Sequence, residues 1–182
     1  MASNYKKIAF LGEGGVGKST ILRLLTEKRL NKTYRPTIGV NFGSLKVNEF
    51  DVALWDIAGQ DRFHFMWPGF IRGSNILFLV TDSSPRNVLK TRQLLQNIVE
   101  KADEIKKKRI DPVKTLGKGY GFGEDVKIVA IANKQDLPGS MSPRQVADLL
   151  GVPCYGMVAI DPQQRLEMYS ILKDEMNKNL TA

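Results

Sequence analysis

A glycine-rich segment near the start of the chain has the residue types and spacing that bind phosphate. The segment Gly12-Glu-Gly-Gly-Val-Gly-Lys-Ser19 follows a short apolar run and precedes an amphipathic stretch. It matches the P-loop pattern G-x-x-x-x-G-K-[ST], in which backbone amides at a helix N-terminus surround phosphate oxygens. The lysine of the pattern reaches the β- and γ-phosphates, and the hydroxyl ligates Mg²⁺. The segment therefore predicts a nucleoside triphosphate site at Gly14, Gly15, Val16, Gly17, Lys18, Ser19 and Thr20.

A second polar segment, Asn133-Lys-Gln-Asp136, follows the apolar run Val126–Ala132. Open α/β sheets bind ligands at the carboxyl ends of their strands, where this segment is expected to lie. The Asp136 carboxylate can accept two parallel hydrogen bonds, from N1–H and the 2-amino group of guanine, which adenine does not offer. A site whose buried polar group is left unpaired by the wrong base can discriminate between the two bases by a factor of roughly 10⁴. The segment alone also fits a polar turn, but beside a P-loop it favours guanine binding by Asn133, Lys134 and Asp136.

A third segment, Asp56-Ile-Ala-Gly-Gln60, supplies residues for metal binding and hydrolysis. A carboxylate at a strand end beside a P-loop is placed to hold Mg²⁺, here through water. Gly59 can offer its N–H to a γ-phosphate because no side chain blocks the approach. Gln60 can orient an attacking water molecule for in-line displacement.

Apolar patterns predict the strands and helices that must position these segments. Nearly continuous apolar runs are typical of parallel strands buried on both faces, whereas a 3.6-residue period indicates helices. The alternation of the two predicts an open, doubly wound α/β sheet. Strands are expected over Lys6–Leu11, Ile76–Val80 and Val126–Ala132, and a hairpin over Leu45–Ile57 that turns at Asn48-Glu49. Helices are expected over Lys18–Thr26, Val88–Ile105, Pro143–Leu150 with Ser142 as N-cap, and Gln163–Leu180.

The composition fits one globular domain over residues 1–182. The chain is 42% hydrophobic and 25% charged, which excludes a disordered chain or a disulfide scaffold. No apolar run approaches the ~20 residues of a membrane helix. A single cysteine, Cys154, cannot form an internal disulfide, which favours a reducing, cytoplasmic setting.

The net charge of +8 is concentrated in part in one stretch. Residues 105–119 contain six Lys or Arg and one Asp, and glycines stand at 117, 119, 121 and 123. We expect residues 107–125 to form a basic, Gly-rich surface insertion. Its positions 106–118 could contact an anionic membrane, although a solvated loop is the favoured interpretation. The net charge is the only feature that suggests a nucleic-acid binder, because the sequence shows no RNA-binding motif and no aromatic platform; we rank this interpretation last.

Four ordered motifs resemble those of the Ras superfamily of small GTPases: Gly12–Ser19, Pro36-Thr37-Ile38-Gly39, Trp55–Gln60 and Asn133–Asp136. The resemblance spans nearly the whole chain. It implies a Ras-like P-loop fold, α/β, with a mostly parallel six-stranded sheet and helices on both faces. It also implies a GTP-hydrolysing switch with bound GTP or GDP, Mg²⁺, and two switch segments, at about 33–42 and 59–70, that recruit effectors.

The motifs and the resemblance together assign roles to single residues. The Mg²⁺ ligands would be Ser19, Thr37 and Asp56, and the catalytic residues Gln60, Lys18 and Thr37. The resemblance adds Tyr34 and Ala159 to the nucleotide-binding set, the latter with its N–H facing the guanine oxygen, although the segment Val158–Ile160 also fits a strand. Slow hydrolysis, raised by a partner, is expected because no arginine is evidently aimed at the phosphates in cis, Arg35 being near enough to note.

The resemblance is Arf-like with Rab-like features. Thr37 and Asp56 are 19 residues apart, an Arf-like interval, and Leu137-Pro138 after the guanine motif is also Arf-like. The segment Ala58–Phe63 resembles Rab. Arf proteins carry a myristoylated N-terminal helix, but residue 2 is Ala2, and no cysteine near the C-terminus accepts a prenyl group. No lipid anchor is therefore expected.

Further expectations concern nucleotide release and partners. Leu30 stands where Ras and many Rab proteins place a phenylalanine against the guanine edge. We therefore expect nucleotide release to be faster than in those relatives, which the off-rates of labelled GDP from the wild type and from Leu30→Phe would test. The aromatic residues between 63 and 70 are core residues by default, but with Ile38, Val40, Phe42 and Trp55 they resemble the face that small GTPases offer to effectors. His64 is expected to be a solvated surface residue. Effector, exchange-factor and activating proteins are the expected partners, and no nucleic acid.

Two alternatives to a hydrolysing switch stay open on the sequence. One is a constitutive GTP-binding interaction module that barely hydrolyses its ligand. The other is a P-loop kinase or ATPase, which would leave Asn133–Asp136 without a role.

Overall fold

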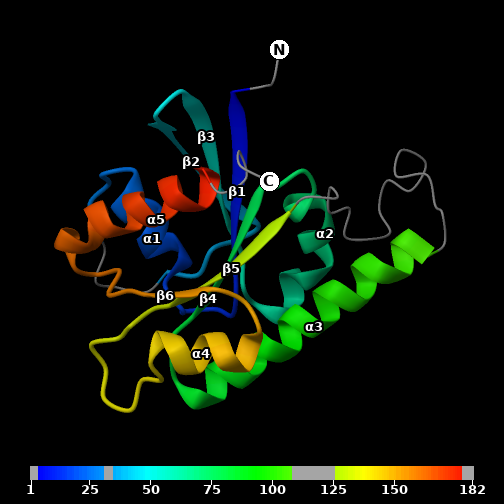
Figure 1. Ribbon diagram of the computed structural model, residues 1–182. Helices are drawn as coiled ribbons and strands as arrows, with labels where there is room; N and C mark the ends of the chain where they lie inside the picture. The colour runs from blue at the N-terminus through cyan, green and yellow to red at the C-terminus, as the bar shows by residue number, and fades with distance from the viewer. Residues whose placement is uncertain (1–3, 31–34, 108–125, 178–182) are drawn as a thin grey trace.

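Six strands form one sheet in the order β2-β3-β1-β4-β5-β6 (Figure 1). The computed structural model describes residues 4–30, 35–107 and 126–177, with residues 101–107 placed by their backbone alone. Of the six described strands, only β2 runs antiparallel to its neighbour. The sheet confirms the α/β, mostly parallel, six-stranded fold. The strands are β1 (Tyr5–Leu11), β2 (Val40–Val47), β3 (Phe50–Ile57), β4 (Ile76–Thr81), β5 (Lys127–Ala132) and β6 (Cys154–Gly156).

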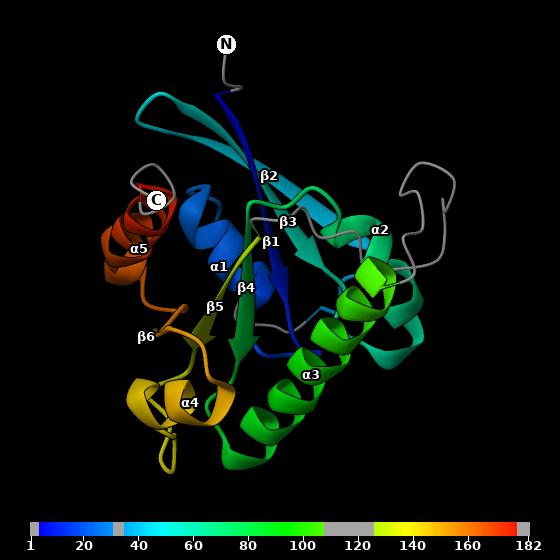
Figure 2. The same cartoon turned by 45° about the vertical axis from the view of Figure 1, so that its right-hand side comes forward.

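Helices cover both faces of the sheet (Figure 2). Buried side chains of α1 and α5 pack on one face, and those of α2, α3 and α4 pack on the other. The helices are α1 (Lys18–Leu25), α2 (Trp67–Ile71), α3 (Pro85–Lys107), α4 (Pro143–Leu150) and α5 (Arg165–Asn177), with two 3₁₀ turns, η1 (Asp61–Met66) and η2 (Pro162–Gln164).

The central strands explain why the apolar runs are continuous. In β1, Ile8 and Phe10 face α1 and α5, whereas Ala9 and Leu11 face the opposite layer. In the same layer as Phe10, Phe78 of β4 stacks on it with ring centroids 5.5 Å apart. Both faces of β1 are thus buried from Ile8 to Leu11, so every residue in that part of the strand is apolar.

Local signals set the ends of several elements as the sequence predicts. The hairpin turns at Asn48, whose φ of 53° lies in the left-handed region that asparagine tolerates. Helix α4 begins with a full capping box between Ser142 and Gln145. The last helix begins at Arg165, later than expected, because a 3₁₀ turn capped by Asp161 precedes it.

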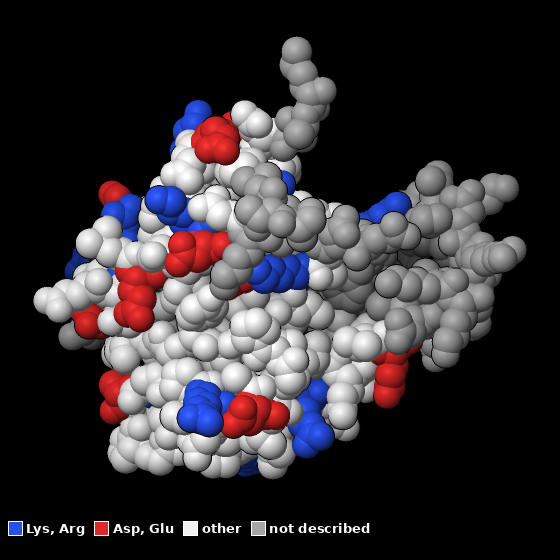
Figure 3. Space-filling view, viewed as in Figure 1, with Lys and Arg blue, Asp and Glu red and all other residues white. Residues whose placement is uncertain are grey.

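Some sequence predictions fall on residues outside the described ranges. These are Tyr34, the first part of the 33–42 switch segment, the 107–125 insertion beyond Lys107, and residues 178–180 at the end of the predicted last helix, and they stay predictions. In the described part of the chain, no helix combines the length and apolar character needed to cross a membrane. On the face shown in Figure 3, basic and acidic side chains of the described residues are interspersed.

Candidate nucleotide site

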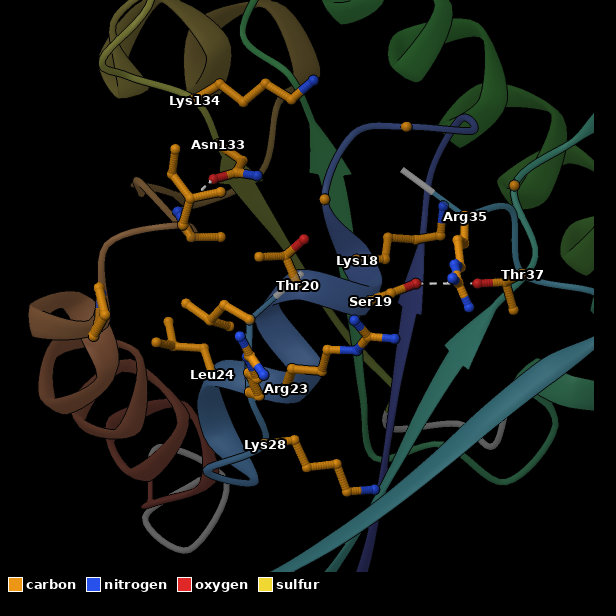
Figure 4. Close-up of a pocket in the computed structure, with 18 of the residues that line it drawn as sticks. Lys18, Ser19, Thr20, Arg23, Leu24, Lys28, Arg35, Thr37, Asn133 and Lys134 are labelled. Atoms are coloured by element: carbon orange, nitrogen blue, oxygen red, sulfur yellow. Dashed lines mark hydrogen bonds between the residues drawn. The ribbon is translucent and has the colours of Figure 1, made fainter. Parts of the chain in front are cut away.

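A cavity of about 1260 Å³ lies at the carboxyl ends of β1, β3 and β5 (Figure 4). Its lining carries more basic than acidic side chains, which suits a polyanionic ligand. The lining includes most of the residues that the motifs single out: Gly14, Gly15, Gly17, Lys18, Ser19, Thr20, Thr37, Gly59, Gln60, Asn133, Lys134, Asp136 and Ala159.

The P-loop connects β1 to α1 and lines the cavity at the N-terminus of that helix. Gly17 caps α1 with φ 107°, and no side chain caps the helix N-terminus. The first-turn N–H groups of a helix have no intrahelical partners and favour an anion. A Cβ at residue 17 would lie 2.2 Å from the Asn133 Nδ2 atom, so only glycine fits there.

Val16 is predicted to bind the nucleotide, but its side chain does not line the cavity. Its side chain is buried in the core layer of α1 and α5. Only its backbone lies along the P-loop, and its carbonyl oxygen accepts a hydrogen bond from Asn133. Any contact of Val16 with phosphate therefore comes from its backbone.

Lys18 is buried beneath the P-loop. Its Nζ donates to the carbonyl oxygens of Gly12 at 2.9 Å and Glu13 at 2.8 Å. Burial lowers the pKa of Lys18 to about 8, while the negative charges of Asp56 and Glu13 oppose that shift. An adjacent phosphate would favour the charged ammonium, because opposite charges stabilise each other most where water is excluded.

Three oxygen-bearing side chains meet next to Lys18. Ser19 Oγ donates to Asp56 Oδ2 at 2.6 Å and lies 3.0 Å from Thr37 Oγ1. Thr37 Oγ1 also donates to Asp56 Oδ2, at 3.3 Å. Asp56 is fully buried, and its Oδ1 has no partner among the described residues. Hydroxyl and carboxylate oxygens are hard ligands, so this set fits Mg²⁺.

Asn41 belongs to the same cluster and was missed by sequence reasoning. Its Nδ2 donates to Asp56 Oδ2 at 3.1 Å and to Thr37 Oγ1 at 3.3 Å. The register of the β2–β3 hairpin pairs Asn41 with Asp56. The predicted hairpin begins at Leu45 and so leaves Asn41 out, whereas β2 begins at Val40, and its register shows that Asn41 faces the carboxylate.

Gly59 and Gln60 border the cavity on the phosphate side. A Cβ at Gly59 would lie 2.1 Å from the Gly12 carbonyl oxygen and 2.5 Å from Lys18 Nζ, so the backbone approach requires glycine. Gln60 is half-buried and is the N-cap residue of η1. Arg35 also lines the cavity, and Figure 4 draws it on the same side as Ser19 and Thr37.

Asn133 ties the base-side loop to the P-loop. Its Nδ2 donates to the Val16 carbonyl oxygen at 2.8 Å, and its Oδ1 accepts from the Ala159 N–H at 2.9 Å. The sequence predicts that the Ala159 N–H faces the guanine oxygen. In the structure this N–H instead donates to the amide oxygen of Asn133. Ala159 still lines the cavity, and residues 158–160 form a turn after β6, not a strand.

The remaining base-side residues lie at the outer end of the cavity. Lys134 adopts φ 61°, a left-handed conformation uncommon for lysine. Asp136 is exposed, and its carboxylate accepts no hydrogen bond from another described residue. Gln135, which the motif leaves unspecified, braces the loop by donating to Ser83 Oγ at 2.8 Å and to the Met141 carbonyl at 3.0 Å.

The segment after Gln60 is anchored by an indole. Trp67 is buried, and its Nε1 donates to the Ala58 carbonyl oxygen at 2.9 Å. The His64 ring lies 3.8 Å from the Trp67 ring, centroid to centroid. His64 is therefore half-buried against the segment, which corrects the expectation of a solvated residue.

Aromatic side chains gather on the outer face of β2, β3 and α2. Trp55 makes an edge contact with Phe42 at 4.6 Å and lies 6.1 Å from Phe70. The buried Lys7 ammonium lies 3.8 Å below the Trp55 ring and donates to the Arg72 carbonyl. Burial lowers the pKa of Lys7. Phe42 stays more than half exposed on this face.

Comparison with known proteins identifies similar chains. The family model described as "Ras of Complex, Roc, domain of DAPkinase" matches residues 7–111. ADP-ribosylation factor-like protein 10 of Mus musculus is 32% identical over 148 residues, which cover 81% of this chain and 52% of the mouse protein. ADP-ribosylation factor-like protein 5 of Caenorhabditis elegans is 30% identical over 147 residues, covering 80% and 71%. The chain thus spans about half the length of the mouse relative.

These similarities agree with the fold and with the cavity that joins a P-loop to a predicted guanine motif. The family match extends over more than half of the chain, and the chain covers more than two thirds of the worm relative. The chain therefore belongs to the Ras superfamily of small GTPases, and it is Arf-like.

Proposed function

We propose that this protein is a molecular switch that binds GTP, hydrolyses it and cycles between GDP and GTP states. The observation that supports it best is the hydrogen bond from Asn133 Nδ2 to the Val16 carbonyl. It joins the loop that carries Asp136 to the loop that carries Lys18, on the wall of one cavity. A phosphate-binding end and a purine-reading end are thereby held at a fixed separation.

In the proposed complex, the P-loop amides from Gly14 to Thr20 surround the phosphates. Lys18 places its ammonium on the β- and γ-phosphates, for which its two carbonyl contacts orient it. Asp136 accepts from N1–H and the 2-amino group of guanine. Lys134 lies along the base, and Asn133 acts mainly by holding both loops together.

Ser19, Thr37 and Asp56 are the residues that would hold Mg²⁺. The unpartnered, buried Oδ1 of Asp56 supports this, because a buried carboxylate oxygen without a partner is costly. When bound, the ion would neutralise charge that develops on the transferred phosphoryl group.

For hydrolysis, Gln60 would orient a water molecule whose oxygen attacks the γ-phosphorus as the bond to the bridging oxygen of GDP breaks. Lys18 stabilises the negative charge on the phosphoryl oxygens, and Thr37 senses the γ-phosphate. The intrinsic rate is proposed to be slow, because an arginine supplied by an activating partner typically contributes ~10³–10⁵.

Loss of the γ-phosphate would release contacts to Thr37 and Gly59. The segments near 33–42 and 59–70 would then relax, and partners that read them would dissociate. The aromatic face formed by the exposed Phe42 and the half-buried Trp55 and Phe70 is the proposed effector surface. Exchange factors and activating proteins are proposed as further partners.

Calorimetry with the magnesium-supplemented protein tests the binding step. We expect GDP and a GTP analogue to bind and ADP to bind at least about 100-fold more weakly. Single-turnover phosphate release then separates a hydrolysing switch from a passive binding module. A protein indifferent to GDP would overturn the proposal.

A further inference from the structure

An ion pair spans the base-side mouth of the cavity. The Glu27 carboxylate, just beyond the end of α1, pairs with the guanidinium of Arg165, the first residue of α5. Both residues line the cavity, as does Pro162 in the turn that precedes α5. We call this pair the Glu27–Arg165 clasp.

The backbone at Glu27 shows that a glutamate there has a cost. Helix α1 ends with the Lys28 N–H bonded to the Arg23 carbonyl oxygen at 2.9 Å, which makes residue 27 the position after the helix cap. Its φ is 55°, in the left-handed region where glycine is the usual residue at this position. Glycine at this position would relieve the backbone strain, but it would also remove the carboxylate that pairs with Arg165.

The described residues offer no aromatic stacking that would retain a ligand at the base end of the cavity. Among the described residues that line it, none has an aromatic side chain; Leu24, Leu30, Leu137 and Ile160 supply the apolar contacts. Aliphatic side chains cover less of a purine ring than an aromatic one does. Among the described residues, other contacts must therefore contribute to retention at this end.

We propose that the Glu27–Arg165 clasp slows nucleotide release by bridging α1 to the loop that carries Ala159 and Ile160. This inference rests on the proposed nucleotide binding. Departure of the base requires the mouth to widen, and widening separates the ends of α1 and α5. While the pair is closed, the two elements that flank the base stay together.

The exposure of the pair sets the size of the effect. The side chains of Arg165 and Glu27 are 38% and 68% exposed, so solvent and salt screen the interaction. Such pairs contribute modestly, and we expect release to accelerate ~2–5-fold when either charge is removed. Arg23, Lys28 and Arg29 line the same region and can partly replace Arg165 as partners of Glu27.

The test is the release rate of fluorescent GDP from the full chain with Mg²⁺, measured for Glu27→Gln, Arg165→Gln and the double variant. Each single variant should release GDP ~2–5-fold faster, and the double variant should be no faster than the quicker single. High salt should bring the wild type close to the variants. Asp51→Asn, which breaks the exposed Lys46–Asp51 pair on the β2–β3 hairpin, is the matched control and should leave release unchanged.

A Glu27→Gly variant separates the clasp from a general loosening of the fold. It removes the same charge as Glu27→Gln but relieves the backbone, so it should unfold at a higher temperature than Glu27→Gln while releasing GDP equally fast. Slower release from the more stable glycine variant would overturn the clasp, as would additive effects in the double variant. A wild type that does not retain GDP at all would instead refute the proposed function.

Discussion

The side-chain amide of Asn133 donates to the carbonyl oxygen of Val16 at 2.8 Å, although 117 residues separate the two along the chain. The same side chain accepts from the Ala159 N–H. Three loops at one edge of the sheet are therefore joined through a single buried amide. Loops that were not joined would lose conformational freedom when a ligand binds. The joined loops are already ordered in the folded protein, so binding does not carry that cost.

Asn133→Ala should destabilise the protein and weaken nucleotide binding together. It leaves the Val16 carbonyl and the Ala159 N–H buried without partners, each at a cost of about 1–3 kcal/mol. Thermal unfolding at a fixed GDP concentration would measure the loss. Gln163→Ala, at an exposed position of η2, should change the midpoint little; equal midpoints for both variants would contradict the role of Asn133 as a tie.

Asp136→Ala should abolish the preference for guanine without disturbing the phosphate end. Inosine nucleotides lack the 2-amino group, so the wild type should bind GDP more tightly than IDP and the variant should bind both alike. Competition against a fluorescent nucleotide measures the ratio. The control Asp148→Ala, on the exposed side of α4, should keep the wild-type ratio. A retained preference in Asp136→Ala would show that another group reads the base.

Gln60→Leu should slow single-turnover phosphate release by at least about tenfold, because the attacking water loses its orienting amide. Its affinity for GDP should stay within about twofold of the wild type, since GDP lacks the γ-phosphate. Gln96→Leu, the same change on the exposed surface of α3, is the control. Equal and negligible rates in all three proteins would favour a binding module over a hydrolysing switch.

Chelation of Mg²⁺ should speed GDP release from the wild type, because the phosphate charges lose their counter-ion. Asp56→Asn should release GDP quickly already and respond little to the chelator, since it lacks the carboxylate that the ion needs. The control is Asp51→Asn, an exposed position of the same strand. A full chelator response in Asp56→Asn would remove Asp56 from the metal site.

Cys154 should react slowly with alkylating reagents in the folded protein. Burial raises the pKa of its thiol from 9.0 to about 11, although a hydrogen bond with the Ala132 backbone opposes the shift. At pH 8 the thiolate, which is the reactive form, is then about 100-fold scarcer than in the unfolded chain.

The same shift gives a pH dependence of stability. The folded thiol keeps its proton between pH about 9 and 11 while the unfolded thiol loses it, so the unfolding free energy should fall as pH rises through that range. Alkylation rates with and without denaturant, and unfolding of Cys154→Ser across that range, measure both effects. Equal rates in the folded and unfolded states would contradict the burial of the thiol.

Much of the fold was predictable because its signals are local. The continuous apolar runs of β1, β4 and β5 and the cap at Ser142 depend on neighbouring residues, and the structure confirms them. The late start of α5 was not predicted, since the 3₁₀ turn at Pro162 competes with the helix over only three residues. The half-buried state of His64 depends on the neighbouring ring of Trp67, which is held by its hydrogen bond to the Ala58 carbonyl oxygen.

The sequence by itself determined which residues bear the chemistry and on which strand ends they sit, because glycine spacing and apolar periodicity act over a few residues. Tertiary structure alone decided that Asn41 faces Asp56, that Asn133 engages the Ala159 N–H, and that Glu27 meets Arg165. Strand register and the packing of helices on the sheet bring these partners together, and no short stretch of sequence encodes either one.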